Sequence, residues 1–238
     1  MLTTWLGILA AGFVVTIELS AMTLVLSVLV AALLALMTIS PWRPLRGIAS
    51  VYVDVFRSIP ILALAISVYY GLGATLHAFG ITPFGTAVVV LTAIESAYLA
   101  ELYRGTLEAV RRPQWDAASS LGLRWIQTVR HVIVPQALPA AIPITLNMAI
   151  AIVKDSSLVS LIAVSEVTLV ANQLIAETFQ PVQIYLLVAL LYVVLILPLS
   201  QVSRRIEVMV ARRLGLQQRT DQEKALERLS IQAEARAG

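Results

Sequence analysis

The residues best suited to chemistry form a short acidic stretch inside an apolar run. Glu95, Tyr98 and Glu101 follow one another at steps of three within the run 84–103. Because helix residues three and four apart are neighbours, a helix over this run presents all three side chains on one broad face. Arg104 lies one turn beyond Glu101 and can neutralise it, so that Glu101 can serve in a structural ion pair or in binding. Glu95 has no basic residue within a turn and must face a cavity, a partner helix or a substrate cation.

A second polar cluster closes the apolar run 138–153. Lys154 and Asp155 stand there beside Ser156 and Ser157. Two interpretations stay open: Lys154 and Asp155 form an interfacial pair that ends a helix, or they reach the same cavity as Glu95.

The elements that hold these groups are expected to lie in a membrane. Hydrophobic residues make up 59% of the 238 positions and charged residues only 13%, against about 25% charged residues in soluble domains. The apolar residues come in long runs, and the polar residues needed for a soluble shell are missing. We therefore predict an all-α membrane protein with five transmembrane helices, at 11–39, 59–76, 84–103, 138–153 and 182–202. The first run does not have the pattern of a secretory signal, and we expect it to be a retained span.

The basic residues predict the orientation of these spans. If the five spans alternate, three Lys or Arg residues in the connection after the first span, five after the third and eight in the tail fall on one side, which is sixteen of the seventeen. Lys154 alone falls on the other side. Because Lys and Arg are retained in cytoplasmic loops, we expect the N-terminus outside and the C-terminus in the cytoplasm. This gives a permease domain over 1–203 and a polar cytoplasmic tail over 204–238, and it excludes nucleic acid as a partner.

The long connection at about 104–137 predicts a surface elbow. Pro113 can open a helix and Gly122 can stop it, and a second helix can follow over 125–134. Such an elbow suits docking into a groove of another protein, although an amphipathic helix without a partner is an open alternative. The residues expected to make the docking contact are Trp115, Asp116, Ala117, Ala118, Leu121 and Gly122.

The same connection carries a family resemblance. It contains D-A-A-S-S-L-G at 116–122, followed thirteen residues later by Pro135. This resembles the signature loop of binding-protein-dependent ATP-binding-cassette (ABC) permeases, E-A-A, three residues, G, nine residues, I-x-L-P. Asp116 stands in place of the Glu, Val132 in place of the Ile and Val134 in place of the Leu.

Three other stretches resemble the polar amino acid uptake subgroup of that family. They are F-R-S-I-P at 56–60, E-S-A-Y-L-A-E-L-Y-R-G at 95–105 and K-D-S-S-L-V-S at 154–160. Together with the signature loop they cover roughly 52–174 in the order and spacing of the family.

The resemblance implies a type I ABC importer permease fold in a bacterial inner membrane. It also implies a dimer with a second permease subunit, identical or paralogous, a pair of cytoplasmic ATPase subunits and a periplasmic or extracellular solute-binding protein. The elbow would then couple the permease to the ATPase. ATP and Mg²⁺ would bind to the ATPase, because neither Lys154 nor Lys224 stands in a G-x-x-x-x-G-K-[ST] loop. We expect no cofactor, catalytic residue or metal site in this chain, which has no cysteine.

An amino-acid substrate gives the two polar clusters a joint role. Glu95 or Asp155 could take the ammonium group, while Lys154 and the serine hydroxyls take the carboxylate. The resemblance favours glutamate, aspartate or glutamine, and an ion-coupled secondary transporter is the alternative. Glu18 is expected in a helix–helix contact, and 158–180 in an external or re-entrant segment. The candidate substrate-binding residues are Glu95, Ser96, Tyr98, Glu101, Lys154, Asp155, Ser156 and Ser157.

Overall fold

In a computed structural model, which describes residues 2–110 and 112–213, the chain folds into helices, as predicted. The tail from 214 onward, which holds most of the predicted polar tail, lies outside the described residues. The helices in chain order are α1 (Leu2–Thr38), α2 (Arg43–Ser58), α3 (Ile61–Ala78), α4 (Pro83–Glu108), α5 (Arg112–Ser120), α6 (Trp125–Thr128), the π-helix η1 (Val129–Ile133), α7 (Val134–Asp155), the 3₁₀ helix η2 (Ser156–Ile162), α8 (Val167–Thr178) and α9 (Pro181–Arg213).

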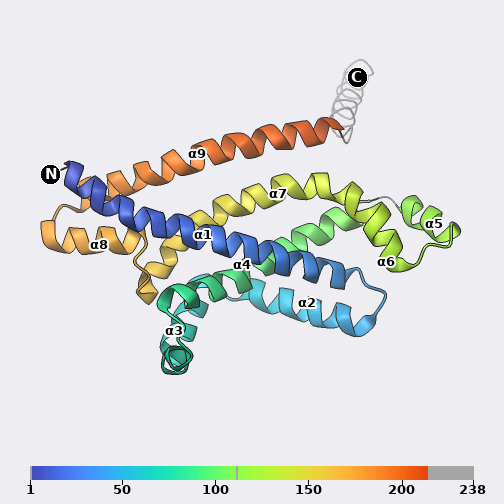
Figure 1. Cartoon of the computed structure of the whole chain (residues 1–238), viewed down its shortest axis with the longest axis horizontal. Coiled ribbons are helices and arrows are strands. Elements are labelled where there is room, and N and C mark those ends of the chain that lie inside the picture. The colour runs from blue at the N-terminus through green and yellow to red at the C-terminus, as the bar shows by residue number, and fades with distance from the viewer. Residues whose placement is uncertain (1, 111, 214–238) are drawn as a thin grey trace, which may run out of the picture.

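Four long helices, α1, α4, α7 and α9, run along the long axis of the molecule (Figure 1). The short helices α5 and α6 lie at one end, and α8 lies at the other end beside the N-terminal half of α1. α1 has one charged residue, Glu18, and is otherwise mostly apolar around its circumference, as is typical of a helix that contacts lipid on one side and protein on the other. Its protein side packs mainly on α4, where Leu19 and Leu91 share one buried cluster and Ala31 and Leu99 share the next.

The second predicted span, 59–76, coincides with the helix α3, which does not continue straight from α2. Four described helices are long and apolar enough to cross a membrane, and a fifth span exists only if α2 and α3 count together, with a bend of 96° between them. The bend lies at Ile59 and Pro60, where Ile59 is extended (φ −96°, ψ 125°). A residue before proline avoids the helical region, and proline cannot donate the next helical hydrogen bond, so α2 has to end here.

The connection expected between the first two spans contains the helix α2, which packs on the bundle through one face. Its Ala49 and Val53 are buried in the cluster that also holds Leu99 of α4 and Met148 of α7. In Figure 1, α2 runs beside the long helices while α3 projects away from them. The side chains at the end of α2 are mostly exposed, among them Val55 and Arg57.

The second helix of the elbow continues without a stop into the next span. It was predicted to end near Pro135, but α6, η1, α7 and η2 form one continuous helical stretch, Trp125–Ile162. The π turns of η1 directly precede Pro135, so the α-type hydrogen bond that this proline cannot make is absent from that turn.

The segment 158–180 folds back onto α1 as η2 and the 12-residue α8, which is too short to span a bilayer. Glu166 is fully buried and caps α8, accepting the N–H groups of Thr168 at 2.8 Å and Leu169 at 2.9 Å. Thr16 of α1 donates its hydroxyl to Glu166 (3.4 Å) and accepts the Val167 N–H (3.2 Å). Burial raises the pKa of Glu166, against the opposing effect of these donors. These hydrogen bonds between α1 and the start of α8 fix the position of the chain that follows α7.

Candidate functional site

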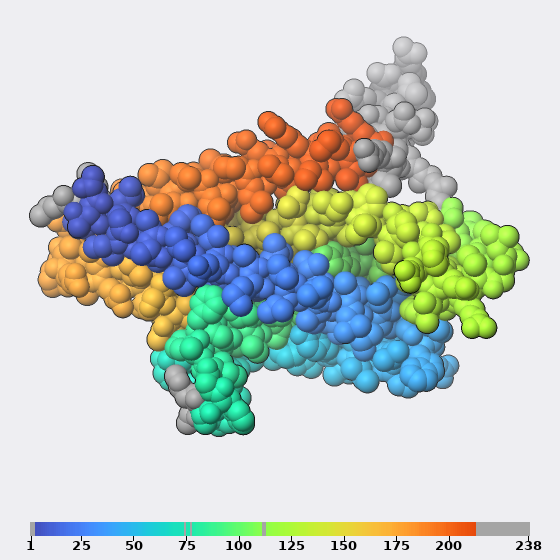
Figure 2. Space-filling model, viewed as in Figure 1, coloured from blue at the N-terminus to red at the C-terminus, as the bar shows by residue number. Residues whose placement is uncertain are grey.

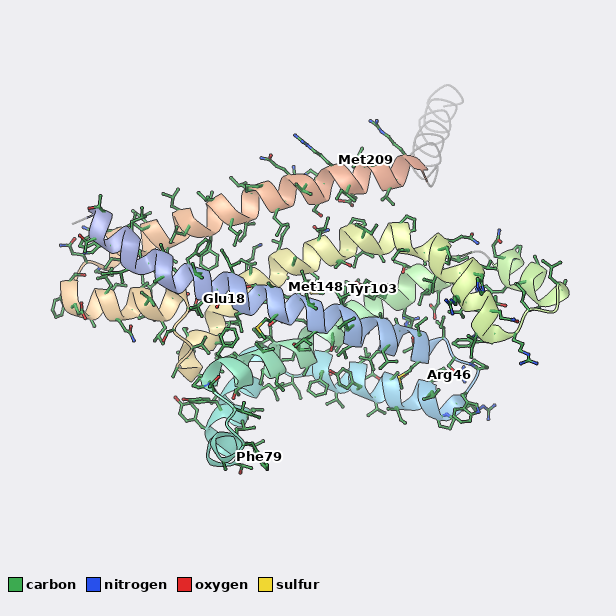
Figure 3. All side chains as sticks on the ribbon, viewed as in Figure 1. Glu18, Arg46, Phe79, Tyr103, Met148 and Met209 are labelled. Carbon is green, nitrogen blue, oxygen red and sulfur yellow. The ribbon has the colours of Figure 1, made fainter. Side chains whose placement is uncertain are left out.

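A polar cavity of about 370 Å³ opens where α2, α3, α4 and α7 meet. Four of the eight predicted binding residues, Glu95, Tyr98, Glu101 and Asp155, contribute to its walls. The face of α4 and the end of α7 that the sequence singled out therefore share one space. Met148, which Figure 3 labels, also lies on its wall. The full lining comprises Arg57, Ile61, Glu95, Tyr98, Glu101, Leu102, Met148, Ala151 and Asp155.

Two carboxyl groups meet on one side of the cavity. Glu95 comes from the middle of α4, is only 3% exposed and neighbours Asp155, the last residue of α7. Apolar contacts among Leu99, Met148 and Ile152 hold α4 and α7 together. Two carboxylates so close repel each other unless a proton or a cation lies between them. This side of the cavity is therefore suited to an ammonium group.

Arg57 lies on another wall of the same cavity. Its guanidinium stands 5.5 Å from the centre of the Tyr98 ring and 4.0 Å from the Glu101 carboxylate. The Tyr98 hydroxyl donates to the Arg57 carbonyl oxygen at 3.2 Å, which ties α4 to the end of α2. A guanidinium in this position is the natural partner of a carboxylate.

The predicted Glu101–Arg104 ion pair is confirmed. Arg104 donates from Nη2 to one Glu101 oxygen at 2.5 Å and from Nε to the other at 3.0 Å. It also contacts Glu108 at 2.6 Å. Because Arg104 already neutralises Glu101 at short range, the more distant Arg57 is left available to a ligand.

Arg57 lines the cavity but is not among the residues predicted from the sequence, where it counts with the arginines of the cytoplasmic connection. The signal that could have found it is Pro60, three residues later, which ends α2 at the cavity. Arg57 also belongs to the F-R-S-I-P stretch on which part of the family resemblance rests.

The other four predicted residues do not line this cavity. Ser96 is buried on the far side of α4, where its hydroxyl lies 3.0 Å from that of Tyr52. Lys154 is exposed. Ser156 and Ser157 each donate to the backbone carbonyl three residues earlier, at 2.8 Å. Such local bonds are usual where a helix tightens into a 3₁₀ turn, and they occupy the hydroxyl donors.

The elbow forms at the place that the sequence indicated. α5 ends at Ser120, and Gly122 follows with φ +71°, in the left-handed region that favours glycine. The Leu123 N–H donates to the Ala118 carbonyl (3.1 Å), and the Gly122 N–H donates to the Ser119 carbonyl (2.9 Å). These two hydrogen bonds form a Schellman motif, which ends the helix.

The six predicted docking residues divide between the two sides of the elbow. Asp116, Ala117, Leu121 and Gly122 are exposed, and Leu121 reaches 79% exposure. Ala118 is buried, and Trp115 packs onto the cluster formed with α1, α4 and α7. The elbow thus offers a small, smooth outer face and is anchored to the bundle by its inner face.

Comparison with known proteins agrees with this arrangement. Residues 25–215 match the family described as the inner membrane component of binding-protein-dependent transport systems. The chain belongs to this family. The L-cystine transport system permease of Bacillus subtilis (strain 168) is 34% identical over 203 residues, which are 84% of this chain and 85% of that protein. The glutamine transport system permease of Escherichia coli (strain K12) is 35% identical over 160 residues, 67% of this chain and 73% of the relative.

A solved structure, a crystal structure of an amino acid ABC transporter with histidines, matches with a TM-score of 0.77 at 30% identity and covers 89% of this chain and 96% of that one. As a permease of this family, the chain is a multi-pass inner membrane component of an amino acid ABC transporter. The secondary-transporter alternative is not favoured.

Proposed function

We propose that this chain moves a polar amino acid across the bacterial inner membrane, driven by ATP hydrolysis in a partner subunit. The observation that carries the proposal is a single cavity with a pair of carboxyl groups on one wall and a guanidinium on another. Glu95 and Asp155 would hold the ammonium group of the substrate, and Arg57 would hold its carboxylate.

The charges of the cavity bear on the class of substrate. With Glu101 bound to Arg104, the groups left for a ligand are two carboxyl groups and one guanidinium. Glutamate or aspartate would bring a second carboxylate with no cation to meet it. We therefore favour a neutral polar amino acid such as glutamine, or a cationic one, over the acidic substrates that the sequence also suggested.

The energy would enter through the elbow. The exposed face formed by Asp116, Ala117, Leu121 and Gly122 would dock into a cytoplasmic ATPase dimer. Trp115 would transmit the motion of that dimer, because it packs against α1, α4 and α7. A second permease subunit would complete the pathway, and a solute-binding protein would deliver the substrate from outside. This requires the orientation predicted from the arginines, with the elbow in the cytoplasm.

Uptake measurements in proteoliposomes test the proposal. The complex would be reconstituted with its ATPase, second permease and binding protein, and supplied with radiolabelled glutamine, arginine or glutamate. We expect uptake of glutamine or arginine to fall about 10-fold or more in Glu95→Gln, since a hydrogen bond to a charged group contributes about 1.5–3 kcal/mol. Glu108→Gln is the matched control, because Glu108 is exposed, lies on the same helix and does not line the cavity.

The outcomes separate the parts of the proposal. Wild-type uptake in both Glu95→Gln and Arg57→Gln would refute the cavity as the binding site. Preferential uptake of glutamate would refute the charge argument. Uptake that continues without ATP would refute the ATP-driven mechanism.

A further inference from the structure

A second hollow, the α1–α7 groove, lies apart from the polar cavity. It has a volume of about 280 Å³. In Figure 2, α4 is visible at its floor, between α1 (blue) and α7 (yellow). The groove is lined by Val28, Ala32, Ala35, Leu36, Tyr103, Thr106, Leu107, Val134, Ala137, Leu138, Ala141, Ile142 and Thr145.

The groove offers almost nothing to a polar ligand. It has no charged residue in its lining, and its three hydroxyl groups already have partners. Tyr103, labelled in Figure 3, shares a hydrogen bond of 2.6 Å with Thr145, and Thr106 donates to the Tyr103 carbonyl at 2.8 Å. An occupant must therefore be a hydrocarbon.

The length of the groove suits a stretch of hydrocarbon chain. On α1 it extends from Val28 to Leu36, about 12 Å at 1.5 Å per residue. An apolar hollow of this length can hold part of one acyl chain.

The groove also opens toward lipid. Leu138 and Ile142, which form its rim on α7, are 56% and 44% exposed on a helix that is long and apolar enough to span the membrane. An acyl chain could enter from the side and lie parallel to the spans.

A basic group lies beyond the elbow end of the groove. The α7 residues of the lining recur at steps of three and four back to Val134. Arg130 lies four residues before Val134, in η1, and is exposed on the side of the molecule that carries the elbow. An anionic headgroup at this level would meet a guanidinium, the preferred partner of phosphate. We propose that the α1–α7 groove binds one acyl chain of an anionic membrane phospholipid, with the phosphate beside Arg130.

This lipid would contact the base of the elbow. Ala35, Leu107 and Ala137 belong both to the groove and to the buried cluster onto which Trp115 of α5 packs. Filling the groove would therefore stiffen the support of the elbow.

Photolabelling tests the proposal with the full chain in complex with its partner subunits in nanodiscs. The probe is phosphatidylglycerol that carries a photoactivatable diazirine on one acyl chain. We expect peptides 28–36 and 134–145 to be labelled several-fold more strongly than the exposed face of α9. Ala32→Trp should abolish this excess, because it places an indole in the groove from an exposed position. Ala189→Trp, on the exposed face of α9, is the control and should leave the excess unchanged.

Two further experiments test which lipid headgroup is preferred and whether a lipid or a protein occupies the groove. Unlabelled phosphatidylglycerol should compete better than phosphatidylethanolamine, and Arg130→Gln should remove this difference while Arg205→Gln keeps it. The proposal would be overturned if all exposed faces were labelled equally, or if Ala32→Trp left the labelling of the groove peptides unchanged. The chain has no cysteine, so a single Leu138→Cys also tests for a protein occupant. A disulfide-linked permease dimer through that residue would show that a second copy covers the groove.

Discussion

The contact between α1 and α8 makes a quantitative prediction for one glycine. A Cβ at Gly12 would lie 2.8 Å from Cγ2 of Val170 and 3.0 Å from Cα of Val167. The Val170 side chain can move aside, but the Val167 contact is to backbone, so α8 itself has to shift. A Cβ at Gly7, one and a half turns earlier on the same helix, would meet nothing within 4 Å.

The pair Gly12→Ala and Gly7→Ala therefore isolates the cost of the close approach. Alanine in place of glycine favours a helix by about 1 kcal/mol, and this gain applies to both variants. Overpacking typically costs about 1–3 kcal/mol, and this cost applies to Gly12→Ala alone. We expect Gly12→Ala to be less stable than Gly7→Ala by about 1–3 kcal/mol, and Gly7→Ala to be no less stable than wild type.

Reversible unfolding in mixed micelles measures the difference, with the loss of helical circular dichroism as the readout. A free energy of unfolding equal for the two variants within about 0.5 kcal/mol would refute the reasoning, because it would mean that α8 does not pack on Gly12 as closely as described.

Two other contacts and the glycine of the elbow give further predictions. Asn147 of α7 and Ser203 of α9 share a hydrogen bond of 2.8 Å; a double-mutant cycle to alanine should give a coupling energy near 0.6 and no more than about 1.7 kcal/mol, and a coupling of zero would contradict the bond. Glu166→Ala should remove the cap of α8, which we expect to cost about 1–2 kcal/mol and to speed hydrogen exchange in 167–178; unchanged exchange would contradict the capping role. Gly122→Asp should abolish substrate-stimulated ATP hydrolysis by the reconstituted complex while the permease still inserts; retained stimulation would contradict docking through the elbow.

The elbow was predictable from the sequence because its signals are local. Pro113 and Gly122 act through their own backbone preferences, so the position of the helix between them needs no knowledge of the rest of the fold. The Glu101–Arg104 pair was predictable for the same reason, since a helix alone brings residues three apart together.

The path of the second span was not predictable in the same way. The run 59–76 was predicted as a span from its apolar residues, but hydropathy does not report the direction in which a helix runs. The bend at Pro60 changes that direction, and with it the surroundings of Arg57. Likewise, the sequence places Ser96 and Lys154 beside cavity residues but does not say on which side of their helices they lie.

The bend between α2 and α3 has a consequence for water. A helix that ends leaves its last four carbonyl groups without intrahelical donors, and Pro60 has no N–H to offer. One of these carbonyls, that of Arg57, is met by the Tyr98 hydroxyl, and this chain end borders the polar cavity. Free backbone groups at membrane depth persist only where they are buried in protein or line a hydrated space. The break therefore predicts a hydrated cavity. In the proposed function, a substrate that enters it would pass from one hydrated surface to another and would keep part of its water.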